Sequence, residues 1–171
     1  MSLRMATLGL LAQHPGSGYD LLKRFEKSMA NVWPATQSQL YGELNKLADA
    51  GLIEVSAIGP RGRKEYRITP AGRSELQHWI TNPADDPPER SAALLRLFLL
   101  GEISRDQALA HLEAVAAHAD AEVARLKELE ASIPWPDADD LYGHAVLEYG
   151  LRLNTMQAQW ARWLTKTIDK R

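Results

Sequence analysis

Three prolines between residues 83 and 88 divide this chain of 171 residues into two segments. The stretch 82–88 cannot continue a helix, because proline has no backbone N–H and its ring clashes with the preceding turn. Residues 1–82 hold ten Lys and Arg against seven Asp and Glu, a net charge of +3, whereas residues 83–171 hold ten against fifteen, a net charge of −5. The total of −2 therefore conceals a basic segment and does not exclude a nucleic-acid partner. We expect two domains, 1–82 and 83–171.

The first segment predicts the order helix, helix, helix, strand, strand, helix. Apolar residues at helical spacing predict a first helix that ends before Pro15, and Ser17 is the expected N-cap of the second. The third helix, 36–50, has a capping-box pattern in Thr36 and Gln39. Its inward face carries Leu40, Leu44 and Leu47. Its outward face then carries side chains that can pair with bases or phosphates: Gln37, Ser38, Tyr41, Asn45 and Lys46.

Two short strands joined by a basic turn follow the third helix. Apolar residues predict strands over 52–57 and 65–68, and Gly62 in the turn permits a close approach of the backbone to a partner. The cations at this turn are Arg61, Arg63 and Lys64, which suit a phosphate or minor-groove contact. A fourth helix from Thr69-Pro70 is expected to bury Leu76, Trp79 and Ile80. This order is that of a winged helix-turn-helix domain, whose third helix enters the DNA major groove.

Several ordered motifs in residues 17–82 resemble the PadR family of transcriptional regulators. They are Gly18-Tyr19-Asp20, VWPATQSQLY at 32–41, LADAGLI at 47–53 and GRKEYRITPAG at 62–72. The second segment resembles the helical C-terminal domain of longer family members, at LLRLFLLG (94–101) and YGLRLN (149–154). The resemblance implies a homodimeric DNA-binding repressor whose C-terminal helices dimerise, and which in some members responds to phenolic acids or other aromatic compounds. It also places Tyr19 near the DNA backbone phosphates and Thr36 at the DNA-binding helix.

Gly42 departs from the family pattern, in which a larger and often polar residue usually stands at this position. Glycine inside a helix costs about 1 kcal/mol relative to alanine. Gly42 either permits close approach of the helix backbone to DNA or removes a side-chain contact, and both interpretations stay open. Because Glu43 and Asp49 make this helix less basic, we expect affinity to depend on the wing and on dimer avidity.

The second segment predicts helices throughout. One covers 89–100, the next begins at Ser104 with Gln107 completing a capping box, and the last runs from about 139 to 168. Along the last helix, apolar residues recur at alternating spacings of four and three: Tyr142, Val146, Tyr149, Leu153, Met156, Trp160 and Trp163. This seam suits a dimer interface, an intramolecular core stripe or the wall of a ligand pocket. Periodicity alone favours the core stripe, whereas the family resemblance favours a two-fold dimer with two DNA-binding helices roughly 34 Å apart.

Aromatic side chains are concentrated near the C-terminus, where they can stack on a planar ligand, although aromatic rings also dominate protein interfaces. The candidate effector-binding residues are Trp135, His144, Arg152 and Trp160. Among them, Arg152 or His144 is the expected partner of a carboxylate on the effector.

The sequence contains no recognisable catalytic or metal-binding pattern. Cysteine is absent, which removes thiol chemistry and fits a reducing, cytoplasmic location. His111 and His118 lie two helical turns apart, too far for joint metal ligation. No phosphate-binding glycine loop, G-x-S-x-G or H-E-x-x-H motif occurs. The longest apolar run, 92–100, is interrupted by Arg96 and reaches about half of the roughly 20 residues that span a bilayer.

We therefore expect a mainly α fold with a small β-hairpin wing, made of an N-terminal winged helix-turn-helix and a C-terminal all-helical dimerisation domain. The expected partners are double-stranded DNA, a second copy of the chain and a small aromatic effector. We expect no enzymatic activity, cofactor, metal or membrane. The alternative is a winged-helix module that binds a protein partner without specific DNA binding; heparin retention with a steep salt dependence would distinguish the two.

Overall fold

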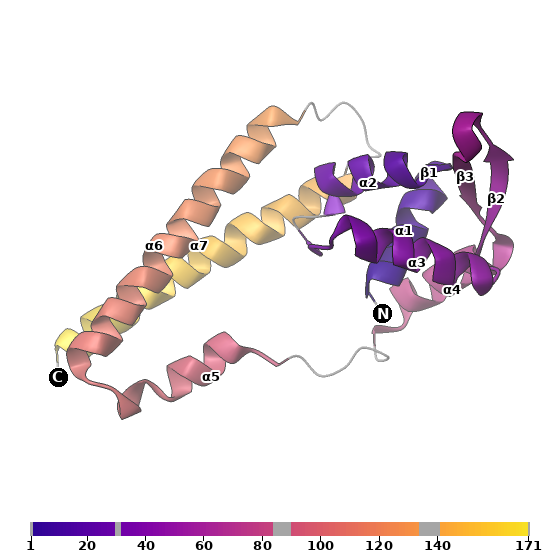
Figure 1. Cartoon of the computed structure of the whole chain (residues 1–171). Helices are drawn as coiled ribbons and strands as arrows, with labels where there is room; N and C mark the ends of the chain where they lie inside the picture. Colours follow the sequence, from indigo (N-terminus) through magenta and orange to yellow (C-terminus); the bar gives the residue numbers. More distant parts are fainter. Residues whose placement is uncertain (1, 30–31, 84–89, 134–140, 171) are drawn as a thin grey trace. The chain divides into compact units, whose positions relative to one another are not determined.

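The computed structural model describes residues 2–29, 32–83, 90–133 and 141–170. The chain forms two compact units, Met1–Pro88 and Glu89–Arg171 (Figure 1). Most described residues are helical, and the described part of the chain has one antiparallel sheet of three strands. The predicted fold class, mainly α with a small β component, is therefore confirmed.

The first unit combines helices with a small sheet. The helices are α1 (Ser2–Gln13), α2 (Gly18–Lys27), α3 (Gln37–Asp49) and α4 (Pro70–Thr81), and the strands are β1 (Gly16–Ser17), β2 (Ile53–Ile58) and β3 (Lys64–Ile68). Strand β3 lies between β1 and β2 and is antiparallel to both (Figure 1). Between β2 and β3, a short 3-10 helix over Pro60–Gly62 forms the tip of the hairpin. This hairpin is the wing of a winged helix-turn-helix.

The core of the first unit is built mainly from leucines on α1, α2 and α3. Leu40, Leu44 and Leu47 are buried as their spacing predicts. They pack in one cluster with residues of α1, α2 and β2, including Leu8, Leu11, Leu21, Phe25 and Ile53. Burying such side chains contributes about 2 kcal/mol each before entropy is counted. The same packing leaves the opposite face of α3 exposed.

Two details of the first unit differ from the sequence-based prediction. Gly16 and Ser17 form a short strand that the sequence did not predict, because their backbones pair with Tyr66 and Glu65 of β3. Ile80 was expected to be buried and is 62% exposed. Leu76 and Trp79 pack against the core instead. Ile80 is one residue further along α4, and the turn of the helix points its side chain toward solvent.

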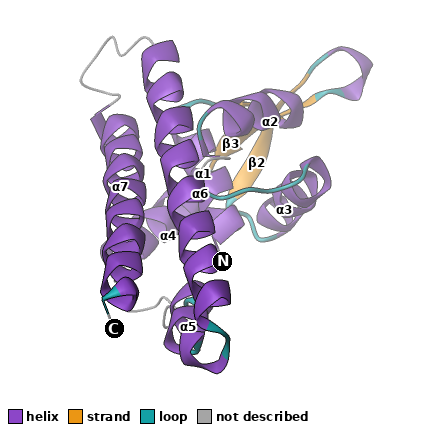
Figure 2. Cartoon of the chain, turned by 90° about the vertical axis from the view of Figure 1, so that its left-hand side faces the viewer, coloured by secondary structure: helices purple, strands orange, loops and turns teal. Residues whose placement is uncertain are grey.

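The second unit consists of α5 (Ala92–Phe98), a 3-10 helix over Leu100–Glu102, and the long helices α6 (Arg105–Ser132) and α7 (Leu141–Asp169). Helix α6 begins with the predicted capping box between Ser104 and Gln107. Helices α6 and α7 lie side by side and antiparallel (Figure 2), since Arg105 at the start of α6 pairs with Asp169 at the end of α7. An Asp120–Arg162 ion pair joins the same two helices further along.

The α6–α7 contact is made largely by small side chains. Its buried residues include Ala116 and Ala119 on α6, and Ala158 and Ala161 on α7. Alanines permit close helix packing but bury little apolar area each. Among the described residues, no helix is long and apolar enough to cross a membrane.

Candidate nucleic-acid interface

Helix α3 presents the predicted polar face. Thr36 caps the helix, since its Oγ1 accepts from the Gln39 N–H at 3.3 Å while Gln39 Oε1 accepts from the Thr36 N–H at 2.8 Å. The side chains on the outward face are at least partly exposed: Gln37, Ser38, Tyr41, Asn45 and Lys46. Lys46 also forms an ion pair with Glu43 at 3.5 Å. Thr36 therefore fixes the start of α3, and the following polar residues are accessible to a partner.

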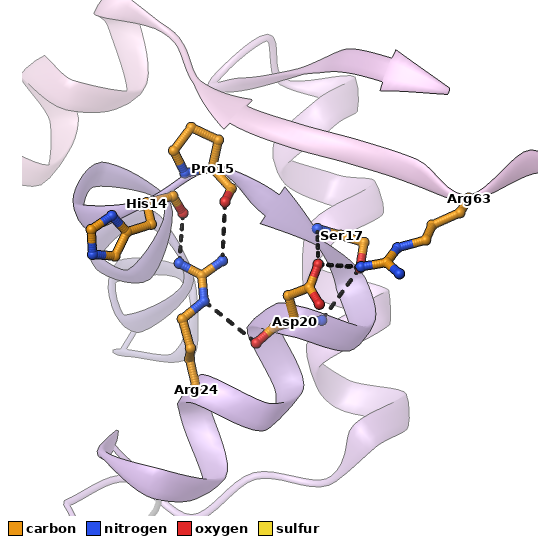
Figure 3. Close-up of polar contacts among 6 residues, drawn as sticks. All are labelled: His14, Pro15, Ser17, Asp20, Arg24 and Arg63. Atoms are coloured by element: carbon orange, nitrogen blue, oxygen red, sulfur yellow. Dashed lines mark hydrogen bonds and ion pairs between the residues drawn. The ribbon is translucent and has the colours of Figure 1, made fainter. Parts of the chain in front are cut away.

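One cation of the wing is exposed, and another is bound to an acidic residue of α2. Lys64 is exposed at the start of β3, whereas Arg63 Nη2 donates to Asp20 Oδ2 on α2 at 2.5 Å (Figure 3). Gly62 has a φ of 74° and permits the turn that brings the chain back into β3. Of Arg61 only the backbone is described, within the 3-10 helix. The prediction of Arg63 as a phosphate contact missed its pairing with Asp20, because the two residues lie far apart in sequence.

Asp20 is held by several donors at the start of α2. Its Oδ2 accepts from the Ser17 hydroxyl at 2.7 Å and from the Ser17 N–H at 3.0 Å (Figure 3). The Ser17 hydroxyl, the Ser17 N–H and the Arg63 guanidinium together lower the pKa of Asp20 from 3.8 to about 2, because each favours the ionised carboxylate. The first turn of α2 is thereby fastened both to β1 and to the wing.

Arg24 secures the loop that precedes α2. Its guanidinium donates to the carbonyl oxygens of His14 at 2.7 Å and Pro15 at 3.3 Å (Figure 3). A Cβ on Gly16 would lie 2.4 Å from Arg24 Nη2, so glycine leaves room for this contact. Arg24 thus has a structural role here, although it is a cation near the candidate interface.

The first turn of α2 also contacts α3. Gly18 is buried under Tyr41, whose Cε1 would lie 2.7 Å from a Cβ at that position. Next to it, Tyr19 is exposed, and Lys23 Nζ lies 5.7 Å from the centroid of the Tyr19 ring. The segment Gly18–Asp20, which we call the α2 first turn, is thus the joint between α3 and the wing.

The aromatic seam of α7 does not face α6. Tyr142 is 79% and Tyr149 68% exposed, and the other seam residues are exposed except half-buried Trp160: Val146, Leu153, Met156 and Trp163. The face that packs on α6 lies roughly 130° around the helix and includes Leu147, Ala158 and Ala161. Within the second unit, the seam is therefore not the intramolecular core stripe.

The candidate effector residues do not converge on one described groove. Arg152 is paired with Glu148 at 2.7 Å and lines an open groove of about 470 Å³ between α6 and α7. His144 contacts Glu130 at 3.3 Å, and neither His144 nor Trp160 lines that groove. Trp135 lies outside the described residues. Within the described ranges, no cluster of three or more His, Asp and Glu is arranged to hold a metal ion.

A winged helix-turn-helix with an exposed polar recognition helix, followed by a unit of long helices, defines the class of winged-helix transcription regulators. Two family models match the chain: "Transcriptional regulator PadR-like family" over residues 7–78, and "Virulence activator alpha C-term" over residues 89–169. Together with the relatives below, the match of residues 7–78 supports a transcriptional regulator of the PadR family.

Relatives of known structure cover nearly the whole chain. The negative transcriptional regulator PadR of Bacillus subtilis is 28% identical, over 98% of each chain. Its structure with operator DNA has a TM-score of 0.77 at 27% identity and covers 98% of this chain and 99% of that one. Its structure with p-coumaric acid has a TM-score of 0.80 at 27% identity and covers 99% of both. The Vibrio cholerae virulence activator AphA has a TM-score of 0.81 at 26% identity, over 98% of both chains.

Proposed function

We propose that this chain is a homodimeric repressor that binds a pseudo-palindromic DNA operator through α3 and the wing, and that a small aromatic effector releases it. The observation that carries the proposal is the exposed polar face of α3, opposite three buried leucines. The B. subtilis PadR structures with operator DNA and with p-coumaric acid support the same two partners here.

DNA contacts are assigned by side-chain chemistry. Gln37 and Asn45 are the candidates for bidentate pairing with adenine in the major groove. Phosphate or base contacts are assigned to Tyr19, Thr36, Ser38, Tyr41, Lys46, Arg61, Arg63 and Lys64. Because Asp20 already neutralises Arg63, we expect Lys64 to contribute more than Arg63 to the dependence of binding on salt.

The second unit is proposed to hold the dimer together. Helices α6 and α7 contact each other largely through alanines. Nothing in the described residues covers the seam on the other side of α7. Exposed aromatic and aliphatic side chains in a continuous heptad pattern are typical of a helix–helix interface. We therefore assign DNA binding to 1–82, and dimerisation together with effector binding to 83–171.

The effector is proposed to be a small aromatic acid whose carboxylate is held by Arg152 in the groove between α6 and α7. His144 and Trp160, which do not line that groove, and Trp135 stay further candidates for contacts with it. Titration of the protein with p-coumaric acid should change tryptophan fluorescence and lower operator affinity. Arg152→Ala should reduce both responses if Arg152 holds the carboxylate. An unchanged fluorescence and an unchanged affinity with a panel of aromatic acids would refute this part of the proposal.

We assign the protein no enzymatic activity and no cofactor, because its family is one of transcription regulators. We also propose a cytoplasmic location, which the absence of cysteine fits.

A gel shift on the DNA upstream of the chain's own gene tests the proposed function. Gln37→Ala and Asn45→Ala should each weaken the specific complex by about tenfold, since a good side-chain–base pair contributes about 1–3 kcal/mol of discrimination. The matched control is Gln77→Ala on α4, which removes an exposed amide that is not among the proposed DNA contacts. Equal affinity for upstream and scrambled DNA would refute sequence-specific binding.

A further inference from the structure

Gly18, in the α2 first turn, leaves room for the Tyr41 ring because it has no side chain. A Cβ on Gly18 would lie 2.7 Å from Cε1, 3.0 Å from Cζ and 3.2 Å from Oη of Tyr41. The first distance is shorter than real Cβ contacts allow, so the hydroxyl end of the Tyr41 ring would have to move away from the Cβ of any larger residue at position 18. Tyr41 is 38% exposed. Much of its ring is therefore covered, although the side chain lies on the exposed polar face of α3.

The backbone at Gly18 does not itself require glycine. Gly51 and Gly62 have φ values of 69° and 74°, in the left-handed region, and Gly18 is not among the positive-φ glycines. It begins α2 directly after the N-cap Ser17, a position that alanine occupies readily. The neighbour that needs the space is therefore Tyr41.

The turn beneath the ring is held by several polar contacts. Ser17 and Asp20 form both hydrogen bonds of a capping box around Gly18, and Arg63 ties Asp20 to the wing. A ring seated on this turn has little freedom left to lose when it binds a partner. On α3, Tyr41 lies one turn from Gln37 and one turn from Asn45, on the same face.

We propose that Gly18 is a positioning residue for DNA recognition: it seats the Tyr41 ring on the α2 first turn, so that the phenol is aligned with the polar face of α3 before DNA binds. This inference rests on the proposed function. Gly18 itself touches no DNA and acts through Tyr41. Replacing it displaces a side chain that can rotate, so that DNA affinity changes while the fold is kept.

The test is a double-mutant cycle in the full-length chain, with affinity measured by fluorescence anisotropy on the upstream duplex at fixed salt. Gly18→Ala and Tyr41→Ala should each weaken binding by about tenfold, as expected for one lost hydrogen bond to a charged group. The double variant should bind like Tyr41→Ala alone, because the effect of Gly18 passes through the ring. Gly9→Ala is the control: its Cβ meets Met29 Cε at an ordinary 3.6 Å, and its affinity should stay that of wild type.

Two further measurements separate the possible failures. In the free protein, a nuclear Overhauser contact should join the Tyr41 ring protons to the Gly18 α protons and disappear in Tyr41→Ala. Thermal unfolding of Gly18→Ala should stay close to wild type, whereas a general loss of structure would lower it. Absence of the Overhauser contact, an unchanged affinity in Gly18→Ala, or additive losses in the double variant would each overturn the inference. If the wild-type chain has no preferred duplex, the proposed function fails, while the Overhauser contact still tests the geometry.

Discussion

The substitution Asp20→Asn tests how the wing and the α2 first turn are joined. The amide that replaces the carboxylate would keep an oxygen for the Ser17 N–H but lose the negative charge that Arg63 and the Ser17 hydroxyl stabilise. Lowering the pKa of Asp20 from 3.8 to about 2 corresponds to about 2.4 kcal/mol if no solvent intervened. Because the Asp20 side chain is 41% exposed, screening reduces the expected loss of unfolding free energy to about 1 kcal/mol.

The pH dependence follows from the sign of this shift. A carboxylate whose pKa is lowered on folding stabilises the folded state above the pKa of the unfolded chain, 3.8, and loses that contribution as the pH falls toward about 2. The difference between wild type and Asp20→Asn should therefore be complete at pH 6, about half as large near pH 3, small near pH 2 and absent near pH 1.

Hydrogen–deuterium exchange measured on peptides from α2 and β3 gives a readout local to this joint. At pH 6, Asp20→Asn should accelerate exchange there by about fivefold relative to wild type at the same pH. The control is Glu26→Gln, which breaks an exposed Lys23–Glu26 pair on the same helix and should change exchange by less than about twofold. An equal effect of both substitutions, or a difference that does not shrink between pH 6 and pH 2, would refute this explanation.

Three other substitutions test separate parts of the structure. Trp163→Asp should weaken the dimer by about 100-fold in sedimentation equilibrium. The control is Thr155→Asp, at an exposed residue of α7 outside the seam, which should leave the dimer intact. Equal effects of the two substitutions would contradict the seam as the dimer interface. Gly42→Ala should raise the unfolding midpoint by about 2–4 °C, because a Cβ there meets nothing within 4 Å and alanine favours the helix by about 1 kcal/mol; a lower midpoint would contradict this. Gly72→Ala should destabilise the protein by about 2 kcal/mol or more in urea unfolding, because its Cβ would lie 2.1 Å from the Leu52 carbonyl oxygen; a neutral result would contradict the packing of α4.

Local signals in the sequence were sufficient for most helices. The capping boxes at Thr36 and Ser104 are formed by residues three positions apart, so their chemistry can be recognised without tertiary structure. The family assignment was likewise correct, because its motifs lie in short, ordered stretches of the first segment.

Features that depend on distant residues were not predictable in the same way. Strand β1 has two residues and forms only because β3 is beside it. The Asp20–Arg63 pair joins positions 43 residues apart. The orientation of α7 was ambiguous, since a second row that includes Leu147, Ala158 and Ala161 also recurs at helical spacing, and packing on α6 selects that row.

The central claim, that a dimer of this chain recognises two half-sites with α3, is tested most directly by selection from a random library of DNA duplexes. Full-length protein should enrich an inverted repeat whose half-sites are centred about 10 base pairs, or a multiple of that, apart. Gln37→Ala should relax the preference at one position in each half-site. Enrichment of no motif, or of a single site without a repeat, would contradict the account.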